Sequence, residues 1–340
     1  MEIVDLRSDT VTKPSKEMKE FMFNAPVGDD VFEEDPTINE LEAYAAKLFG
    51  KEAGLYCASG TQTNQIAINV HCKPGDEVIC DKNAHIYMYE GGGIAKNSGC
   101  SVRLIEGNRG RINATQVKNA IMDPKNVHYP LTALVALEDT MNRGGGAIYS
   151  IDEIKKIKSL CEKEHLPLHL DGARVFNALI ETKIDFVEYG NLFDTISICL
   201  SKGLGAPVGS VLLGTKAFIQ KARRVRKVMG GGMRQGGIIA AGGLFALKNN
   251  IERLQIDHQK AKEIEQTLKN CSWVESVMET QTNIVVANLN NKKSVDNVIK
   301  TLENNQILAM PFGGDMIRIV THLDNSDEQI SHVNKVLKSI

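Results

Sequence analysis

The segment SICLSKGLGAPVGS, residues 197–210, decides the fold. The apolar run from Ile196 to Leu200, which overlaps the beginning of the segment, predicts a buried strand. Lys202 follows the strand, and three glycines and a proline follow the lysine. Ligands of open α/β sheets bind beyond the carboxyl ends of the strands. Lys202 is therefore either a partly desolvated, nucleophilic amine in a ligand site or an ordinary loop lysine that reaches water.

The glycines first suggest a nucleotide site. Gly203, Gly205 and Gly209 have the spacing G-x-G-x-x-x-G, and Pro207 lies between them. The dinucleotide fingerprint requires G-x-G-x-x-G at the start of a helix, and no GxxxxGK[ST] motif occurs in the chain. The sequence therefore excludes NAD and ATP sites built on these motifs. We expect the glycines to let the chain turn tightly beside a bound cofactor.

Outward from this segment, apolar runs alternate with helical patterns. Runs such as ALVAL and ISICL lack polar alternation, which is typical of strands buried on both faces. The pattern predicts an α/β fold with a mostly parallel central sheet and helices on both faces. The expected strands are 54–57, 77–80, 102–105, 132–137, 166–170, 195–200 and 210–213, and the main helices are 15–23, 36–48, 62–71, 114–121, 151–165 and 216–227.

The pattern changes near residue 250. A long helix with a charged face (251–270) precedes a strand, a helix, a strand pair within MPFGGDMIRIV and a last helix that begins at Ser326. This interleaving predicts a smaller α+β unit. We expect an extended N-terminal arm at 1–14, a large domain at 15–250 and a small C-terminal domain at 251–340.

Composition excludes several classes of protein. The chain has 340 residues and a net charge of −2, so nothing favours a nucleic acid or an anionic membrane as partner. The first residues lack the apolar region of a signal peptide. The most apolar run, 238–247, is shorter than the ~20 residues of a membrane-spanning helix. Seven cysteines without a CxxC motif indicate reduced thiols, and hence a cytoplasmic protein.

Two further segments carry candidate ligand groups. In HLDGAR, Asp171 ends a predicted strand and Arg174 follows, so Asp171 is either a ligand carboxylate or a helix cap. In ASGTQTN, Gly60 and Thr61 begin a helix, which is either an anion site or a plain cap. His169 is expected to be a core or supporting histidine, because HLPLH is not a zinc motif, and we expect no metal site.

Together, the three segments indicate one cofactor. A phosphate-binding turn, an Asp and a Lys lie at successive strand ends. Pyridoxal phosphate requires an anchor for its phosphate, a carboxylate for its ring nitrogen and an amine for its Schiff base. The combination is more specific than any of its parts.

At this point the chain resembles a known family over nearly its whole length. DLRSDTVTKP, APVGDDV, SGTQTN, HLDGARVFNA, SICLSKGLGAPVGS, GGGMRQ and IRIVTHLD match the threonine aldolases, which are pyridoxal-phosphate enzymes of the aspartate-aminotransferase fold type, fold type I. The resemblance implies that fold and a homotetramer, a dimer of dimers in which two subunits build each active site. The glycines of GGGMRQ fit close approach of two backbones.

The resemblance also implies residue roles. Lys202 would form the Schiff base, Asp171 would pair with the ring nitrogen, and Gly60 and Thr61 would hold the phosphate. The remaining roles are Lys227 at the phosphate of the neighbouring subunit, Arg174 near the 3′ oxygen or the substrate carboxylate, His85 stacked on the ring, His128 at the substrate hydroxyl, and Ser8 and Arg318 at the substrate carboxylate.

The implied reaction is retro-aldol cleavage of L-threonine or L-allo-threonine to glycine and acetaldehyde. His85 or His128 could be the base, directly or through water, since histidine titrates near neutral pH; a stacking or purely structural role is the alternative for each. Phe32 stands where many family members have a tyrosine, which leaves the stereochemical preference open. Amino-acid β-elimination, transamination and a non-catalytic binding protein are the alternatives.

Overall fold

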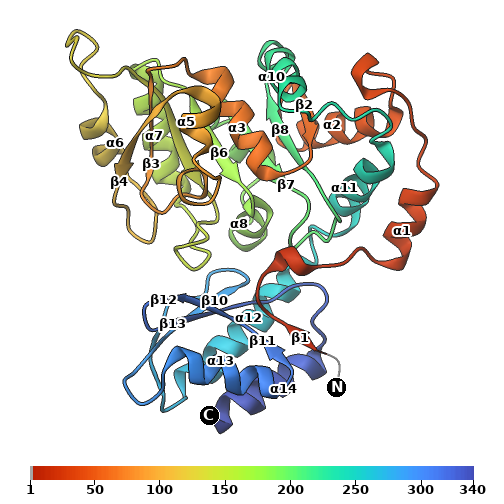
Figure 1. Cartoon of the computed structure of the whole chain (residues 1–340), viewed down its shortest axis with the longest axis vertical. Helices are drawn as coiled ribbons and strands as arrows, with labels where there is room; N and C mark the ends of the chain where they lie inside the picture. The colour runs from red at the N-terminus through yellow and green to blue at the C-terminus, as the bar shows by residue number, and fades with distance from the viewer. Residues whose placement is uncertain (1–2) are drawn as a thin grey trace.

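The structure, a computed structural model, describes residues 3–340 and has two lobes (Figure 1). The larger lobe is built on a seven-stranded sheet with the order β2-β8-β7-β6-β5-β3-β4. These strands are β2 (Ala53–Cys57), β3 (Glu77–Asp81), β4 (Ser101–Ile105), β5 (Thr132–Glu138), β6 (Leu168–Gly172), β7 (Thr195–Cys199) and β8 (Ser210–Gly214).

The predicted sheet is confirmed as mostly parallel. Only β8 runs antiparallel, against both β2 and β7, and the other neighbours pair in parallel. All seven expected strands are present within two residues of their predicted limits. The largest shift concerns β6, which begins at Leu168 rather than 166. The amide of Leu166 still bonds to the carbonyl of Cys161 in the preceding helix, so the strand starts only after Pro167.

Helices cover both faces of this sheet, as the apolar strands require. On β5, Val135 and Leu137 belong to the core cluster that includes Ile154, whereas Leu134 and Ala136 pack with Ile68 on the other face. The helices of the larger lobe are α1 (Lys16–Phe23), α2 (Pro36–Leu48), α3 (Gly60–His71), α4 (His85–Met88), α5 (Gly93–Ser98), α6 (Ala114–Ala120), α7 (Ile151–Lys163), α8 (Val175–Thr182), α9 (Phe186–Gly190), α10 (Lys216–Val228) and α11 (Gly237–Asn249).

The smaller lobe has its own antiparallel sheet, of order β12-β13-β10-β9. Its apolar core is separate from that of the large lobe. The elements are α12 (Leu254–Lys269), β9 (Val274–Val277), β10 (Ile284–Leu289), α13 (Val295–Asn304), β11 (Ile307–Leu308), β12 (Met310–Gly313), β13 (Met316–Val320) and α14 (Asp327–Ser339).

The N-terminal arm belongs with the smaller lobe in its packing. Strand β1 (Val4–Asp5) pairs in parallel with β11, and the buried side chains of Val4 and Leu6 lie in the core of this lobe. The arm then passes between the lobes through a short 3₁₀ helix, Asp9–Val11 (Figure 1). The division into an arm at 1–14 and domains at 15–250 and 251–340 stays a proposal, with the arm best grouped with residues 251–340.

Candidate active site

Lys202 lies in the loop that joins β7 to the antiparallel β8. The loop is fixed at both ends, since Leu200 N donates to Gly209 O (3.0 Å) and Ala206 N donates to Leu200 O (3.1 Å). The carbonyl of Lys202 accepts from Gly205 N (2.8 Å) and from Thr12 Oγ1 of the arm (2.9 Å). The backbone of the lysine is therefore held by its own turn and by the arm.

The glycines of this loop contact protein side chains. Gly205 has φ +79°, and a Cβ there would lie 2.6 Å from Leu323 of the smaller lobe. Gly209 has φ +109°, and a Cβ would lie 2.4 Å from the ring of Tyr56. Both positions require glycine for conformation and for space. The expected tight turn is present, neighbouring side chains also require glycine at these two positions, and the place of the turn beside a cofactor stays a prediction.

A cavity of about 290 Å³ opens beside Lys202, between the two lobes. It brings together five residues that the sequence singled out, and these come from the arm, the large lobe and the small lobe. Its lining consists of Ser8, Thr10, His85, Tyr89, Asn142, Arg143, Arg174, Lys202, Met310, Pro311, Phe312 and Arg318.

Asp171 lies at the carboxyl end of β6, in register with Ser197 of β7 and Glu138 of β5. Its side chain is buried, and Oδ2 accepts from Asn64 Nδ2 of α3 (2.9 Å). The same Nδ2 donates to Glu90 Oε1 (2.9 Å). Asp171 thus has no cationic hydrogen-bond partner among the described side chains. Its carboxylate could therefore pair with a protonated ring nitrogen of a cofactor.

His85 begins α4 and lies between buried acids. Its amide donates to Glu138 Oε2 (2.7 Å), and Nδ1 lies 3.0 Å from Glu90 Oε1. Burial alone would lower the pKa of His85, but the hydrogen bond to Glu90 and the charges of Asp171 and Glu138 raise it. Burial, together with the charge of Asp171, raises the pKa of Glu138 to about 7.

Arg174 precedes α8 and is paired inside the protein. Its Nε and Nη2 donate to the two oxygens of Asp9, at 2.8 and 2.6 Å, and both side chains are buried. Burial would raise the pKa of Asp9, but Arg174 lowers it to about 2, and Lys202 adds to this effect. Asp9 balances the charge of Arg174, which leaves this arginine less suited than Arg318 to bind a substrate carboxylate.

Arg318 reaches the cavity from β13. It donates from Nη1 to Asn142 Oδ1 and from Nη2 to Arg7 O, both at 3.0 Å, while its buried Nε has no partner. Burial, reinforced by the charge of Arg174, lowers the pKa of Arg318 to about 10, so the side chain stays charged at neutral pH. Arg143, a cavity residue that the sequence did not indicate, lies 4.2 Å from the centre of the Phe312 ring.

The start of α3 offers an anion cradle. Ser59 caps the helix through the amide of Gln62, and the first amides of a helix have no partner within it. A Cβ on Gly60 would meet only Ser210 Oγ, at 3.6 Å, and that buried hydroxyl has no hydrogen-bond partner. Open space at Gly60, free amides and an unpaired hydroxyl fit the phosphate of pyridoxal phosphate, next to a lysine and a buried carboxylate.

Gly60, Thr61 and Asp171 lie outside the lining of this cavity, and three further residues of interest lie at the surface of the single chain. His128 lies on the exposed segment between α6 and β5, and Lys227 is exposed at the end of α10. Phe32, in a 3₁₀ helix (Asp30–Phe32), is 69% exposed. The roles of His128 and Lys227 therefore depend on another copy of the chain or on movement, and they stay predictions.

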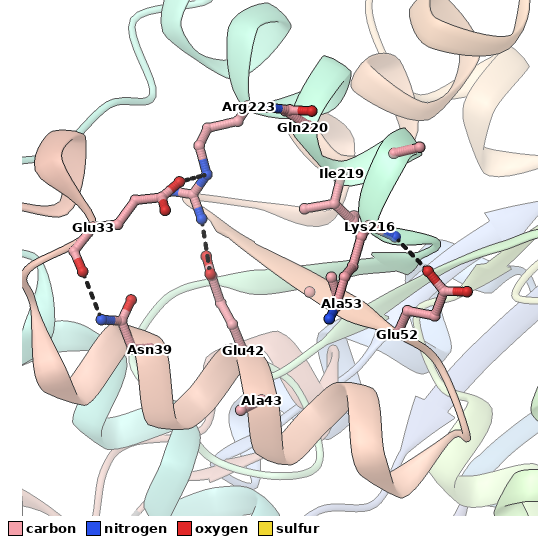
Figure 2. Close-up of a pocket in the computed structure, with 12 residues that line it drawn as sticks. Glu33, Asn39, Glu42, Ala43, Glu52, Ala53, Lys216, Ile219, Gln220 and Arg223 are labelled. Carbon is pink, nitrogen blue, oxygen red and sulfur yellow. Dashed lines mark hydrogen bonds and ion pairs between the residues drawn. The ribbon is translucent and has the colours of Figure 1, made fainter.

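A larger hollow, of about 680 Å³, lies between α2 and α10 (Figure 2). Glu42 and Arg223 meet in it, with Arg223 Nη2 donating to Glu42 Oε2 (3.0 Å). Burial raises the pKa of Glu42 to about 7, although Arg223 opposes the shift. None of the predicted site residues lines this hollow, so size alone does not mark the active site.

Sequence comparison decides the family. The profile of the family described as beta-eliminating lyase matches residues 5–291. The chain belongs to this family. Among the relatives of this chain, the low-specificity L-threonine aldolase of Escherichia coli is 41% identical over 97% of both chains. The low-specificity L-threonine aldolase 1 of Arabidopsis thaliana is 42% identical over 95% of this chain and 92% of its own length.

Comparison with solved structures shows the same fold in a threonine aldolase. A threonine aldolase from Leishmania major superposes with a TM-score of 0.86 at 20% identity, covering 99% of both chains. The chain is a lyase of fold type I, and the predicted cofactor, pyridoxal phosphate, is confirmed for the family. Within residues 3–340, no helix is long and apolar enough to span a membrane.

Proposed function

We propose that this member of the beta-eliminating lyase family cleaves L-threonine and L-allo-threonine to glycine and acetaldehyde. The observation that carries the proposal is the cavity in which Lys202, His85 and Arg318 converge. Relatives that are about 40% identical over almost the whole chain are low-specificity L-threonine aldolases, which favours the same reaction here.

The proposed roles follow from charge and position. Lys202 holds the cofactor, Asp171 faces its ring nitrogen, and Gly60 and Thr61 hold its phosphate. When bound, pyridoxal phosphate supplies a ring that withdraws electrons from the bond to be broken. Arg318, which lines the cavity and stays charged, and Ser8 bind the substrate carboxylate and orient the side chain for cleavage.

His85 is placed to act near the substrate hydroxyl or on the ring. Its Nδ1 is held by Glu90, which leaves Nε2 as the ring nitrogen without a hydrogen-bond partner among residues 3–340. A proton at Nε2 can therefore move to or from a hydroxyl or a bound water. His128 would reach this position from another copy or by movement, so we keep His85, His128 and water as the candidate bases.

The test is direct incubation of the purified holoenzyme with each amino acid. We expect equal amounts of acetaldehyde and glycine, without ammonia. Lys202→Ala should lose the reaction and the visible absorption of lysine-bound cofactor. Release of ammonia and a 2-oxo acid would instead show β-elimination, and a protein that binds no cofactor would be a binding protein of this fold.

We further propose a homotetramer in the cytoplasm. Lys227 and His128 lie outside the cavity, and large apolar side chains beside them are exposed, with Val228 at 88% and Val127 at 93%. Such side chains favour contacts between copies. All seven cysteines are free and buried, which fits a reducing compartment. Native mass spectrometry should give four subunits, and a monomer that retains full activity would contradict shared sites.

A further inference from the structure

A buried hydrogen-bonded chain leads from the cofactor site along the face of the sheet that α3 covers. Asn64 Nδ2 donates to both Asp171 Oδ2 and Glu90 Oε1, each at 2.9 Å. On its other side, Asn64 Oδ1 lies 3.1 Å from His169 Nε2. The two carboxylates define the orientation of the amide, because only its NH₂ group can donate to them.

The hydrogen on His169 can then be assigned. The carbonyl oxygen of Asn64 can only accept, so Nε2 of His169 carries the hydrogen. The ring is fully buried, and burial lowers the pKa of His169 to about 3, so at neutral pH the ring is uncharged and its Nδ1 must accept. Thr195 Oγ1, at 2.9 Å, is the donor to that nitrogen.

The chain has one more link. Thr195 Oγ1 lies 3.0 Å from His71 Nε2 at the end of α3. Because the hydroxyl hydrogen is directed to His169, the oxygen accepts from His71. Burial lowers the pKa of His71 to about 4, which leaves this ring neutral, and its position is fixed by the nearby Phe218 ring, 4.6 Å away between centroids. All hydrogens therefore point in one direction, towards Asp171.

Position on the strand makes the link to Asp171 specific. His169 and Asp171 are two residues apart on β6, so their side chains lie on the same face of the sheet. Asn64, on α3 above that face, contacts both. If the amide turned over, its oxygen would face two carboxylates, and its NH₂ group would face the Nε2–H of His169. The Nε2–H of His169 therefore opposes the turned orientation together with the two carboxylates.

We propose that His169 is a positioning residue for the cofactor: through Asn64 it fixes the Asp171 carboxylate in the orientation that receives the ring nitrogen of pyridoxal phosphate. The proposal rests on the proposed role of Asp171 and does not depend on which amino acid is cleaved. Glu90 has a parallel role, since its Oε1 joins Asn64 to His85 Nδ1.

The experiment compares two replacements of His169 in the full-length protein. His169→Gln can place an amide NH₂ near the former Nε2 and still donate to Asn64, whereas His169→Phe keeps a ring and removes the donor. We expect His169→Phe to raise the dissociation constant for pyridoxal phosphate by about tenfold, the loss typical of one hydrogen bond, and His169→Gln to restore most of the affinity. Melting of the cofactor-free proteins serves as the control for packing.

A second measurement keeps the proposal testable if the phenylalanine variant does not fold. The ¹⁵N spectrum of the cofactor-free wild-type protein should show His169 neutral, with its hydrogen on Nε2, at every pH from about 5 to 9. A hydrogen on Nδ1 would overturn the proposal. So would equal cofactor affinity in the wild type and His169→Phe. Because neither readout uses substrate, loss of the proposed aldolase reaction is a separate result.

Discussion

At the residue scale, the site depends on how two arginines differ. Arg174 is neutralised by Asp9, whereas Arg318 has a buried Nε without a partner and stays charged. The sequence indicated both arginines but could not assign the substrate carboxylate between them. The distinction came from Asp9, whose contact with Arg174 spans 165 positions of the chain.

Arg318→Lys should therefore weaken substrate binding. Lysine keeps the charge but cannot make the bidentate contact of a guanidinium. Loss of one charged hydrogen bond costs about 1.5–3 kcal/mol, so KM for L-allo-threonine should rise roughly tenfold or more. Steady-state kinetics checks this, with Arg103→Lys, whose arginine pairs with Glu77 outside the cavity, as the matched control. Equal KM values in both variants would remove Arg318 from carboxylate binding.

Glu42, outside the active site, predicts a pH effect on stability. Its folded pKa, about 7, is higher than its ordinary value of 4.5, so the folded protein binds a proton that the unfolded chain has lost. The stabilisation that comes from binding this proton is complete below pH ~4.5 and is lost as the pH rises through ~7. Glu42→Gln should flatten the fall in unfolding free energy over that range, measured by urea titration. An unchanged slope would show that Glu42 does not titrate there.

At the element scale, the strands were predictable and their partners were not. Each apolar run that was predicted as a strand became one, since burial on both faces excludes polar alternation, whereas the most apolar run, 238–247, lies in α11. The short β1, β9 and β11 were missed because two to four residues carry no periodic pattern. Asn64 and Glu90 were missed for a related reason. Asn64 bonds to Asp171 and to Glu90, and Asp171, which is distant in sequence, comes close to them only after the sheet forms.

The loop between β7 and β8 gives a prediction at this scale. Gly205→Ala combines a positive φ with a clash against Leu323, and its amide also holds the Lys202 carbonyl. Gly75→Ala is the matched control, since it has φ +94° and nothing within 4 Å of a Cβ. Backbone strain alone costs roughly 1–3 kcal/mol. Gly205→Ala should lower the melting temperature more than the control and should also weaken cofactor retention.

At the scale of the whole molecule, Asp9 connects the two lobes. It pairs with Arg174 of the large lobe and accepts from Asn283 Nδ2 of the small lobe (3.2 Å). The arm thus supplies one of the charged contacts between the lobes, and Lys262 with Glu181 and Arg109 with Glu279 supply others. This feature was not predictable, because the sequence placed the arm outside both domains.

Asp9→Asn should destabilise the protein strongly. It leaves the Arg174 charge buried without its partner, which typically costs about 3–5 kcal/mol. The folded pKa of Asp9, about 2, lies below its ordinary value of 3.8, so the pair stabilises the protein above pH ~4 and is lost towards pH ~2. In Asp9→Asn, the part of the fall in unfolding free energy between pH ~4 and pH ~2 that comes from this pair should be absent. Asp5→Asn, which breaks the exposed pair with Arg7, should change stability by less than about 1 kcal/mol.

The pairing of β1 with β11 also affects the order in which the protein is completed on the ribosome. Val4 is made long before its partner Ile307, because the whole sheet of the large lobe lies between them in the sequence. The sheet of the large lobe can form while the first strand still waits, with Val4 and Leu6 uncovered. Pairing between the two ends of a chain is slow. The apolar side chains of Val4 and Leu6 therefore stay uncovered in the nascent protein until β11 has been made.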